Sequence, residues 1–428
     1  MQHTVTEVRL KNGACGLLID VPGATVMSFQ FQFRAGNRYV ASKDIYETAH
    51  IMEHMAFGAN AQFASEHEYE AEFIKNGAYH NAWTSDLSMV YVADCADFEW
   101  ERILQLQQVA ITQPKFNQTE LEAEKGNVRS ELVGYLNNHN RVLWPKIQQL
   151  LGNDIYTYHQ RVRTIARVQL SDIQEHYRRT HTSDNLRFVI AGKMAGRKAQ
   201  IKRMLESWQL PRGERFAVPH DELHSGKPTL IRRKEASNLT FGWSMEIPRE
   251  LSDKEDAALD CLNRILTGTM HSRIFGKARK QGMAYGMFSD GSVGKYESSW
   301  DFGGEVECDK AERLFALIVS ELQAVLRGEI TEAELEAAKS YGLGRYQMGA
   351  QTVAQISGFY TSRFFWDGYV KDYAKVPQEI KGTTLEQMNA VAREFIAANT
   401  WALAGVSSGE RSDIVRLGEQ LEGLFAQG

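Results

Sequence analysis

The chain has 428 residues, of which 43% are hydrophobic and 24% are charged, and its formal net charge is −5. This composition is typical of a globular protein, and the length suffices for two domains. Lys and Arg are interspersed with acids, so no basic stripe predicts nucleic-acid binding. No run approaches the roughly 18 apolar residues of a membrane-spanning helix.

The N-terminus and the cysteines indicate in which cellular compartment the protein is expected. The first residues, MQHTVTEVRLKNG, lack the basic-then-apolar pattern of a secretory signal and predict a first strand. The four cysteines lie far apart and form no CxxC pair, which disfavours a disulfide framework and a cysteine zinc site. We expect a reducing compartment and take the cytoplasm as the default, with a periplasmic or organellar location left open.

The first half of the chain shows strand and helix periodicities in groups. Apolar and polar residues alternate over Val26–Phe33, which predicts a strand with one buried face. Helical patterns follow at Tyr46–Phe57, Glu66–Lys75, Glu99–Ile111 and from Gln118 to about Tyr135. Because strands and helices are grouped rather than strictly alternating, we predict an α+β fold.

The segment from His50 to His54 has the pattern H-x-x-E-H. On a helix, these two histidines are four residues apart and lie on one face, so both imidazoles can reach one metal ion. Two imidazoles and a carboxylate suit Zn²⁺ and leave a fourth position for water. Glu53 projects beside the metal, where it can act as the general base that activates the zinc-bound water.

A simpler interpretation of this pattern is a solvated surface helix or a buried histidine pair. The neighbouring Ile51, Met55 and Phe57 make the helix largely apolar, which argues against surface decoration of both histidines. A third ligand could come from the predicted helix that begins at Gln118, where Glu124 and Glu131 share one face. By themselves, these two acids are no different from ordinary solvated glutamates.

A weak internal repeat relates the two halves. Glu120–Lys125 (ELEAEK) recurs as Glu334–Lys339 (ELEAAK), and Val92–Cys95 has a counterpart in Glu305–Cys308. In both halves an amphipathic helix leads into an apolar strand that ends in Ala-Gly, and all three matches share an offset of 213 to 215 residues. We therefore predict a duplication with domains at residues 1–210 and 229–428, joined by a Pro- and Gly-rich linker at 211–228.

These motifs together resemble the inverzincin metallopeptidases related to pitrilysin, insulysin and the mitochondrial processing peptidase. Members carry H-x-x-E-H and a ligating Glu at a distance matched by Glu131, which follows His54 by 77 residues. Asn81–Ser85 (NAWTS) is similar to the family's N-A-x-T strand, and Gln113–Phe116 (QPKF) to its P-x-F turn. The resemblance covers essentially the whole chain and implies two homologous domains, each a mostly antiparallel sheet packed against helices.

The resemblance also implies roles for individual residues. Glu131 would be the third zinc ligand, with one Zn²⁺ per chain, and Glu124 would orient the site from outside the ligand set. Asn81 and Ala82 would lie on an exposed edge strand that binds the substrate as an added β-strand.

The second half shows the duplication without the metal ligands. At an offset of 214 residues, His50 falls on Arg264, Glu124 on Ala338 and Glu131 on Arg345. In the family, the degenerate half lends an Arg and a Tyr that contact the substrate carbonyl, and Arg279 and Tyr285 fill these positions here. Their interval is one residue shorter than the family's, so either this chain or a partner subunit could supply the pair.

The leading hypothesis is a zinc metalloendopeptidase that hydrolyses peptides or unfolded segments in a closed dimeric chamber. A family member of this length has half of the domains that enclose such a chamber, so we expect a homodimer or a heterodimer with a homologous subunit. A processing peptidase that removes a presequence or leader, as the catalytic subunit of a heterodimer, is the alternative within catalysis. A non-catalytic structural or peptide-binding homologue is the alternative from another class.

Overall fold

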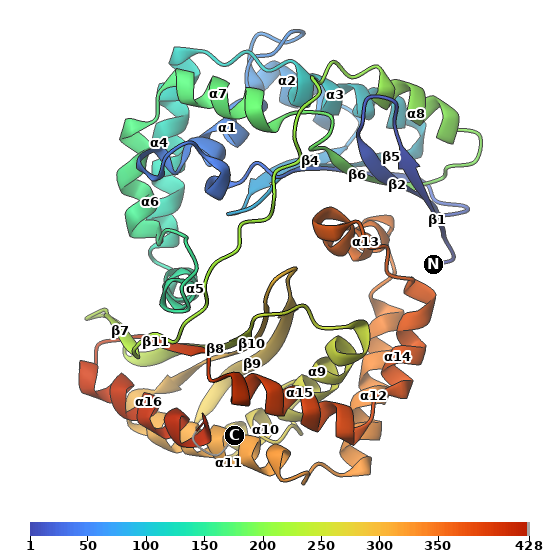
Figure 1. The fold of residues 1–428 in the computed structure, drawn as a ribbon. Coiled ribbons are helices and arrows are strands. Elements are labelled where there is room, and N and C mark those ends of the chain that lie inside the picture. The colour runs from blue at the N-terminus through green and yellow to red at the C-terminus, as the bar shows by residue number, and fades with distance from the viewer. Residues whose placement is uncertain (426–428) are drawn as a thin grey trace. The chain divides into compact units, whose positions relative to one another are not determined.

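The computed structural model describes residues 1–425, which form two units, each with a sheet packed against helices (Figure 1). The predicted α+β class is confirmed, including the packing of each sheet against a group of helices. No helix among residues 1–425 is both long and apolar enough to span a membrane.

The first unit contains a six-stranded sheet in the order β1-β2-β6-β3-β5-β4, in which only the β2–β6 pair is parallel. Strand β4 lies at one edge and pairs with β5 alone. The strands are β1 (Thr4–Arg9), β2 (Cys15–Asp20), β3 (Val26–Phe33), β4 (Tyr79–Thr84), β5 (Met89–Ala96) and β6 (Arg187–Gly192).

The second unit contains a five-stranded sheet in the order β7-β11-β8-β10-β9, in which only the β7–β11 pair is parallel. Apart from the additional β1, this order repeats that of the first sheet, strand for strand, as the duplication predicts. The strands are β7 (Thr229–Arg232), β8 (Asn238–Ile247), β9 (Ala284–Val293), β10 (Ser298–Glu307) and β11 (Trp401–Ser407).

Helices of both units cover these sheets (Figure 1). Those of the first unit are α1 (Thr48–Ala56), α2 (Glu66–Ile74), α3 (Trp100–Thr112), α4 (Gln118–Tyr135), α6 (Tyr158–Thr164), α7 (Leu170–Thr180), α8 (Lys198–Glu206) and α13 (Val353–Asp367). Those of the second unit are α5 (His139–Leu150), α9 (Asp253–Leu266), α10 (Phe275–Lys280), α11 (Ala311–Leu326), α12 (Glu332–Met348), α14 (Val376–Gly382), α15 (Leu385–Ala398) and α16 (Arg411–Phe425).

Local sequence explains where many of these elements begin and which side they bury. Strand β3 has the predicted bounds, and its alternate residues Met27, Phe29, Phe31 and Phe33 are fully buried. Helix α9 begins with a capping box, in which the Ser252 and Glu255 side chains each bond the other's backbone N–H. The four helices predicted in the first half are present, with ends that differ by at most two residues.

The two units do not coincide with the two halves of the sequence. Residues 135–157, which include α5, group with the second unit, and residues 348–371, which include α13, group with the first. Helix α5 packs on β8 and β11 through Leu143 and Ile147, and α13 packs on β3 and β6. The two helices start 214 residues apart, so each copy gives the equivalent helix to the other unit. Residues 211–228 form neither helix nor strand.

Candidate metal centre

Helices α1 and α4 of the first unit bring three ligand-type side chains together. His50 and His54 lie one turn apart on α1, and Glu131 lies near the end of α4. One ligand atom from each of the three residues falls within 4.8 Å of the other two. Among residues 1–425, this is the only group of three or more His, Cys, Asp or Glu side chains with such geometry.

The distances inside this group fit a single metal ion. Glu131 Oε2 lies 3.5 Å from His50 Nε2 and 3.4 Å from His54 Nε2. Two ligands that each lie about 2.0–2.1 Å from a tetrahedral zinc ion are about 3.3–3.4 Å apart. The group therefore has the spacing and the donor types of a His₂Glu zinc site.

A carboxylate on the far side of each imidazole fixes its orientation. His50 Nδ1 lies 3.0 Å from Glu47 Oε2, and His54 Nδ1 lies 2.9 Å from Glu124 Oε2. An Nδ1–H that donates to a carboxylate leaves the Nε2 lone pair directed at Glu131, which is the tautomer that a metal requires. Glu124 thus lies where the resemblance implies an orienting residue.

The carboxylates also raise the pKa values of the two histidines. Burial lowers the pKa of His50, but hydrogen bonds to Glu131 and Glu47 outweigh burial and raise that pKa overall. For His54, burial is likewise outweighed by Glu124 and Glu131, which raise its pKa to about 10. Both shifts favour protonation of the imidazoles in the absence of a metal, and a bound dication would displace protons from these nitrogens.

Glu53 lies on α1 and is not part of the three-residue ligand group. Its side chain is buried, with 8% of the residue exposed. Burial raises the pKa of Glu53 above its usual range, although the nearby His50 and His54 partly oppose this effect. A carboxylate with a raised pKa is a stronger base, which suits a group that accepts a proton from water.

Strand β4 lies next to α1 and carries Asn81 and Ala82 at the edge of the first sheet. Asn81 is exposed, Ala82 is buried, and the Ala82 backbone N–H donates to Asn81 Oδ1 at 2.9 Å. Because β4 pairs with β5 only, its other side can accept a further strand.

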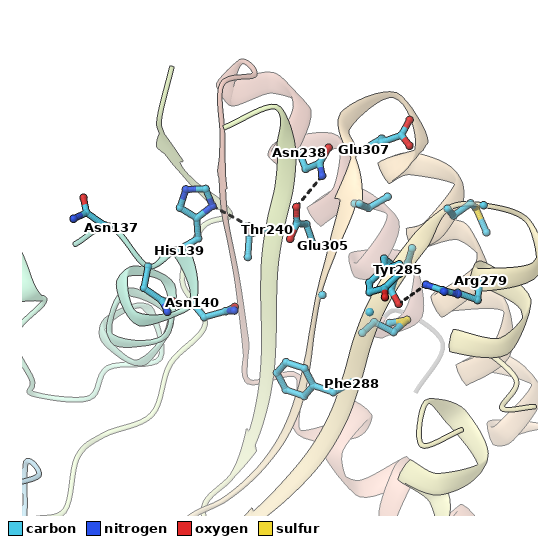
Figure 2. Close-up of a pocket in the computed structure, with 18 residues that line it drawn as sticks. Asn137, His139, Asn140, Asn238, Thr240, Arg279, Tyr285, Phe288, Glu305 and Glu307 are labelled. Carbon is cyan, nitrogen blue, oxygen red and sulfur yellow. Dashed lines mark hydrogen bonds between the residues drawn. The ribbon is translucent and has the colours of Figure 1, made fainter. Parts of the chain in front are cut away.

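Arg279 and Tyr285 lie in the second unit, beside a groove of about 1070 Å³ (Figure 2). Arg279 Nη1 donates to the Tyr285 carbonyl at 3.0 Å, and its guanidinium lies 4.1 Å from the centre of the Tyr285 ring. The short interval in sequence therefore does not separate the two side chains. Tyr285 is 84% exposed, so its hydroxyl is accessible to a ligand in the groove.

The positions that correspond to the ligands in the second half carry no comparable group. Arg264 on α9 bonds Asp260 at 2.8 Å, and its Nη1 would lie 2.4 Å from a Cβ at Gly342 on α12. Glycine at 342 thus allows the guanidinium to lie against α12. Ala338 and Arg345, also on α12, offer no carboxylate.

Sequence reasoning missed two residues of the metal centre, Glu47 and Arg161. Glu47 precedes His50 by three residues, so helical spacing could have revealed it. Arg161 on α6 donates to both Glu47 oxygens, at 2.5 Å from Nε and 3.1 Å from Nη2. The two positions are separated by 114 in sequence, so no local signal predicts their contact.

Both halves of the chain are similar to known protein families. Residues 17–163 match the family described as insulinase (peptidase family M16), and residues 167–341 match the peptidase M16 inactive domain. The β subunit of the human mitochondrial-processing peptidase is 29% identical over 151 residues, or 34% of this chain and 30% of that protein. The chain thus aligns with well under half of this relative's length.

Two solved structures share the fold over nearly the whole chain. A protease from Helicobacter pylori has a TM-score of 0.81 and 16% identity, covering 95% of this chain and 100% of its own. A Pseudomonas fluorescens protein described as a peptidase M16 inactive domain has a TM-score of 0.83 and 16% identity, with 95% and 98% covered. At such identities these structures show a common architecture and nothing about activity.

Proposed function

The chain belongs to peptidase family M16, and from that premise we propose that it is a zinc metalloendopeptidase acting on peptides or unfolded segments. The observation that carries the proposal is the convergence of His50, His54 and Glu131 at zinc-ligand spacing. The site residues fit Zn²⁺ in donor type, in spacing and in the orientation of both imidazoles. When bound there, Zn²⁺ would supply the Lewis acidity that lowers the pKa of water and polarises a peptide carbonyl.

Glu53 performs the proton transfers in this proposal. Its carboxylate accepts a proton from the water that attacks the scissile carbonyl and then gives that proton to the leaving amine. Its burial beside the two histidines supports this role, because a desolvated carboxylate holds its proton more tightly.

The substrate would bind as an added strand along the free side of β4, near Asn81 and Ala82. Main-chain hydrogen bonds then supply most of the affinity and leave side-chain selectivity loose. Tyr285 would stabilise the developing oxyanion and Arg279 would hold that tyrosine, either in the same chain or across a dimer. We further propose a homodimer or a heterodimer with a homologous subunit, whose chamber would exclude folded proteins.

A processing peptidase is the second candidate, and the similarity to a subunit of the mitochondrial-processing peptidase favours it. In that case the chain would be the catalytic partner that removes a presequence or leader. A non-catalytic homologue is the third candidate, because residues 167–341 match a domain described as inactive. The presence of both histidines, Glu53 and Glu131 argues against that alternative.

Replacing the base tests the proposal directly. Glu53→Gln should lower the hydrolysis of a fluorogenic peptide by about 10²- to 10⁴-fold, while zinc content stays at one ion per chain. Glu122→Gln, an exposed acid on α4 that pairs with Lys125, is the control and should leave both unchanged. Equal rates for Glu53→Gln and wild type would contradict the proposal, as would an absence of hydrolysis by wild type with any homologous partner added.

A further inference from the structure

A buried ion pair lies directly behind the imidazole of His50. Glu47 is fully buried, with 0% of the residue exposed, and it immediately precedes α1. One of its oxygens, Oε2, faces His50 Nδ1 at 3.0 Å. Arg161 reaches Glu47 from α6 and donates to both carboxylate oxygens.

A buried Glu47 carboxylate destabilises the fold unless both of its oxygens have hydrogen-bond donors. A carboxylate removed from water loses its favourable solvation, and only close partners offset that loss. Here the guanidinium supplies two charge-assisted hydrogen bonds in a fixed planar geometry, and the imidazole N–H supplies a third. Because all three bonds converge on one carboxylate, Glu47 has little freedom to rotate, and the His50 ring is held with it.

We propose that Glu47 and Arg161 form a positioning pair that sets the metal affinity of the site through His50, without either residue touching the metal. The inference rests on the proposed metal site and adds the residues that determine its strength. Glu47 keeps the proton on Nδ1 and the lone pair on Nε2, and its negative charge makes the imidazole a better donor. Arg161 keeps Glu47 in place and compensates its charge.

Through Glu47, the metal ligand His50 depends on the position of α6, which is distant in sequence. Arg161 also lies 5.1 Å from the centre of the Tyr158 ring at the start of α6. A shift of α6 would therefore remove two hydrogen bonds from Glu47 and loosen His50. His54 is supported differently, because its partner Glu124 accepts a hydrogen bond from the neutral side chain of Asn127 at 3.0 Å.

A second Arg–Glu pair with a buried carboxylate lies in the same unit and provides a matched control. Glu99 is buried and is bound by Arg102 and by Asn76, and this pair lies at the start of α3 rather than on α1, α4 or α6. Loss of charge at Glu99 should cost folding stability without altering metal affinity. The control thus separates a structural role of a buried ion pair from a positioning role.

The test measures the zinc affinity of the full chain by competition with a chromophoric chelator, together with thermal unfolding of the metal-free protein. Glu47→Gln and Arg161→Met should each weaken zinc binding by about 10- to 100-fold. Combining the two changes should add little to either alone, because Arg161 acts through Glu47. Glu99→Gln should lower the melting temperature but leave zinc affinity within about twofold of wild type.

Arg161→Lys keeps the charge but loses the bidentate geometry, so its zinc affinity should fall between wild type and Arg161→Met. This variant serves if Glu47→Gln does not fold. Wild-type affinity in Glu47→Gln or in both Arg161 variants would overturn the positioning role while leaving the proposed zinc site intact. Additive losses in the double variant would overturn the action through Glu47. Failure of wild type to bind zinc would instead overturn the proposed function, and the pair with it.

Discussion

The first unit places two imidazoles and a carboxylate between α1 and α4, whereas the second unit places a guanidinium and small residues between α9 and α12. The sheets beneath have the same strand order, and the same helix of each copy is exchanged between the units. In the first unit the crossing of the two helices is lined by carboxylates that attract a cation. In the second, Arg264 lies against Gly342 and is itself the cation. A duplicated scaffold can therefore keep its packing while one copy loses its metal ligands.

The largest expected difference between the units concerns the third ligand. Glu131→Gln should remove nearly all peptide hydrolysis and weaken zinc binding by more than about 100-fold, beyond the range for residues outside the ligand set. The matched change in the second unit, Arg345→Gln, alters an exposed residue on α12 and should affect neither. Zinc content and hydrolysis rates of both variants check this contrast. A comparable loss in Arg345→Gln would show that the second copy also contributes to metal binding.

The next effect tests whether the second unit takes part in catalysis. If the exposed Tyr285 hydroxyl stabilises the oxyanion, Tyr285→Phe should lower kcat by about 10²-fold, the lower end for the loss of one such donor. KM and zinc content should stay close to wild type. Steady-state kinetics of the dimer, or of the complex with a homologous subunit, gives the answer. Unchanged kcat would assign the second unit a purely structural role.

The two units should also respond to pH in opposite directions. In the first unit, burial lowers the pKa of His176 to about 4 and of His181 to about 3. Both are neutral in the folded state, so stability is lost as pH falls below their unfolded value of about 6.5.

In the second unit, burial raises the pKa of Glu246 to about 7 and of Asp301 to about 6. Folding then favours the protonated carboxyls, so stability falls as pH rises from about 4 through 7. In the zinc-loaded chain the metal takes the place of protons on His50 and His54, whose raised pKa values would otherwise favour the first unit at low pH. Hydrogen exchange of that form at pH 5.5 and pH 8 should show acid opening the first unit and base opening the second. We expect changes on the order of 1–2 kcal/mol, smaller than the full shifts because buried groups relax. Stability changes of the same sign in both units would contradict the predicted difference in pH dependence.

The smallest effect concerns the edge strand. Ala82→Pro removes one backbone N–H from β4 next to the metal centre, and should raise KM by about 3- to 10-fold through the loss of one hydrogen bond. Ser292→Pro in the second edge strand, β9, is the control and should leave KM unchanged. Circular dichroism verifies that both variants fold. An increase in KM only for the β9 variant would place the substrate strand on the second sheet.

Sequence patterns predicted most of the secondary structure and part of the metal site. The alternation in Val26–Phe33 and the i, i+4 spacing of His50 and His54 are local signals, and each predicts geometry within one element. Glu131 could be identified only through resemblance, since its contact with the histidines depends on how α4 packs on α1. Helix exchange between the units was invisible, because α5 has the same amphipathic pattern whichever sheet it covers.

The residues that orient the metal ligands also show that sequence patterns do not predict tertiary contacts. Glu47 lies within one helical turn of His50. Its charge can be buried because Arg161 on α6 donates two hydrogen bonds to it, and this contact depends on tertiary packing. Arg279 and Tyr285 illustrate the reverse case. Their shortened interval left open whether this chain or a partner subunit supplies the pair. The structure brings the two residues into contact because the turn after α10 brings Arg279 back to the start of β9.

The most direct test of the central claim is the number and place of zinc ions in the full chain. Metal analysis combined with anomalous diffraction at the zinc edge should find one ion per chain, bound by His50, His54 and Glu131, and none near Arg264. His54→Ala should abolish that signal. A chain without zinc, or zinc that persists after His54→Ala, would contradict the account.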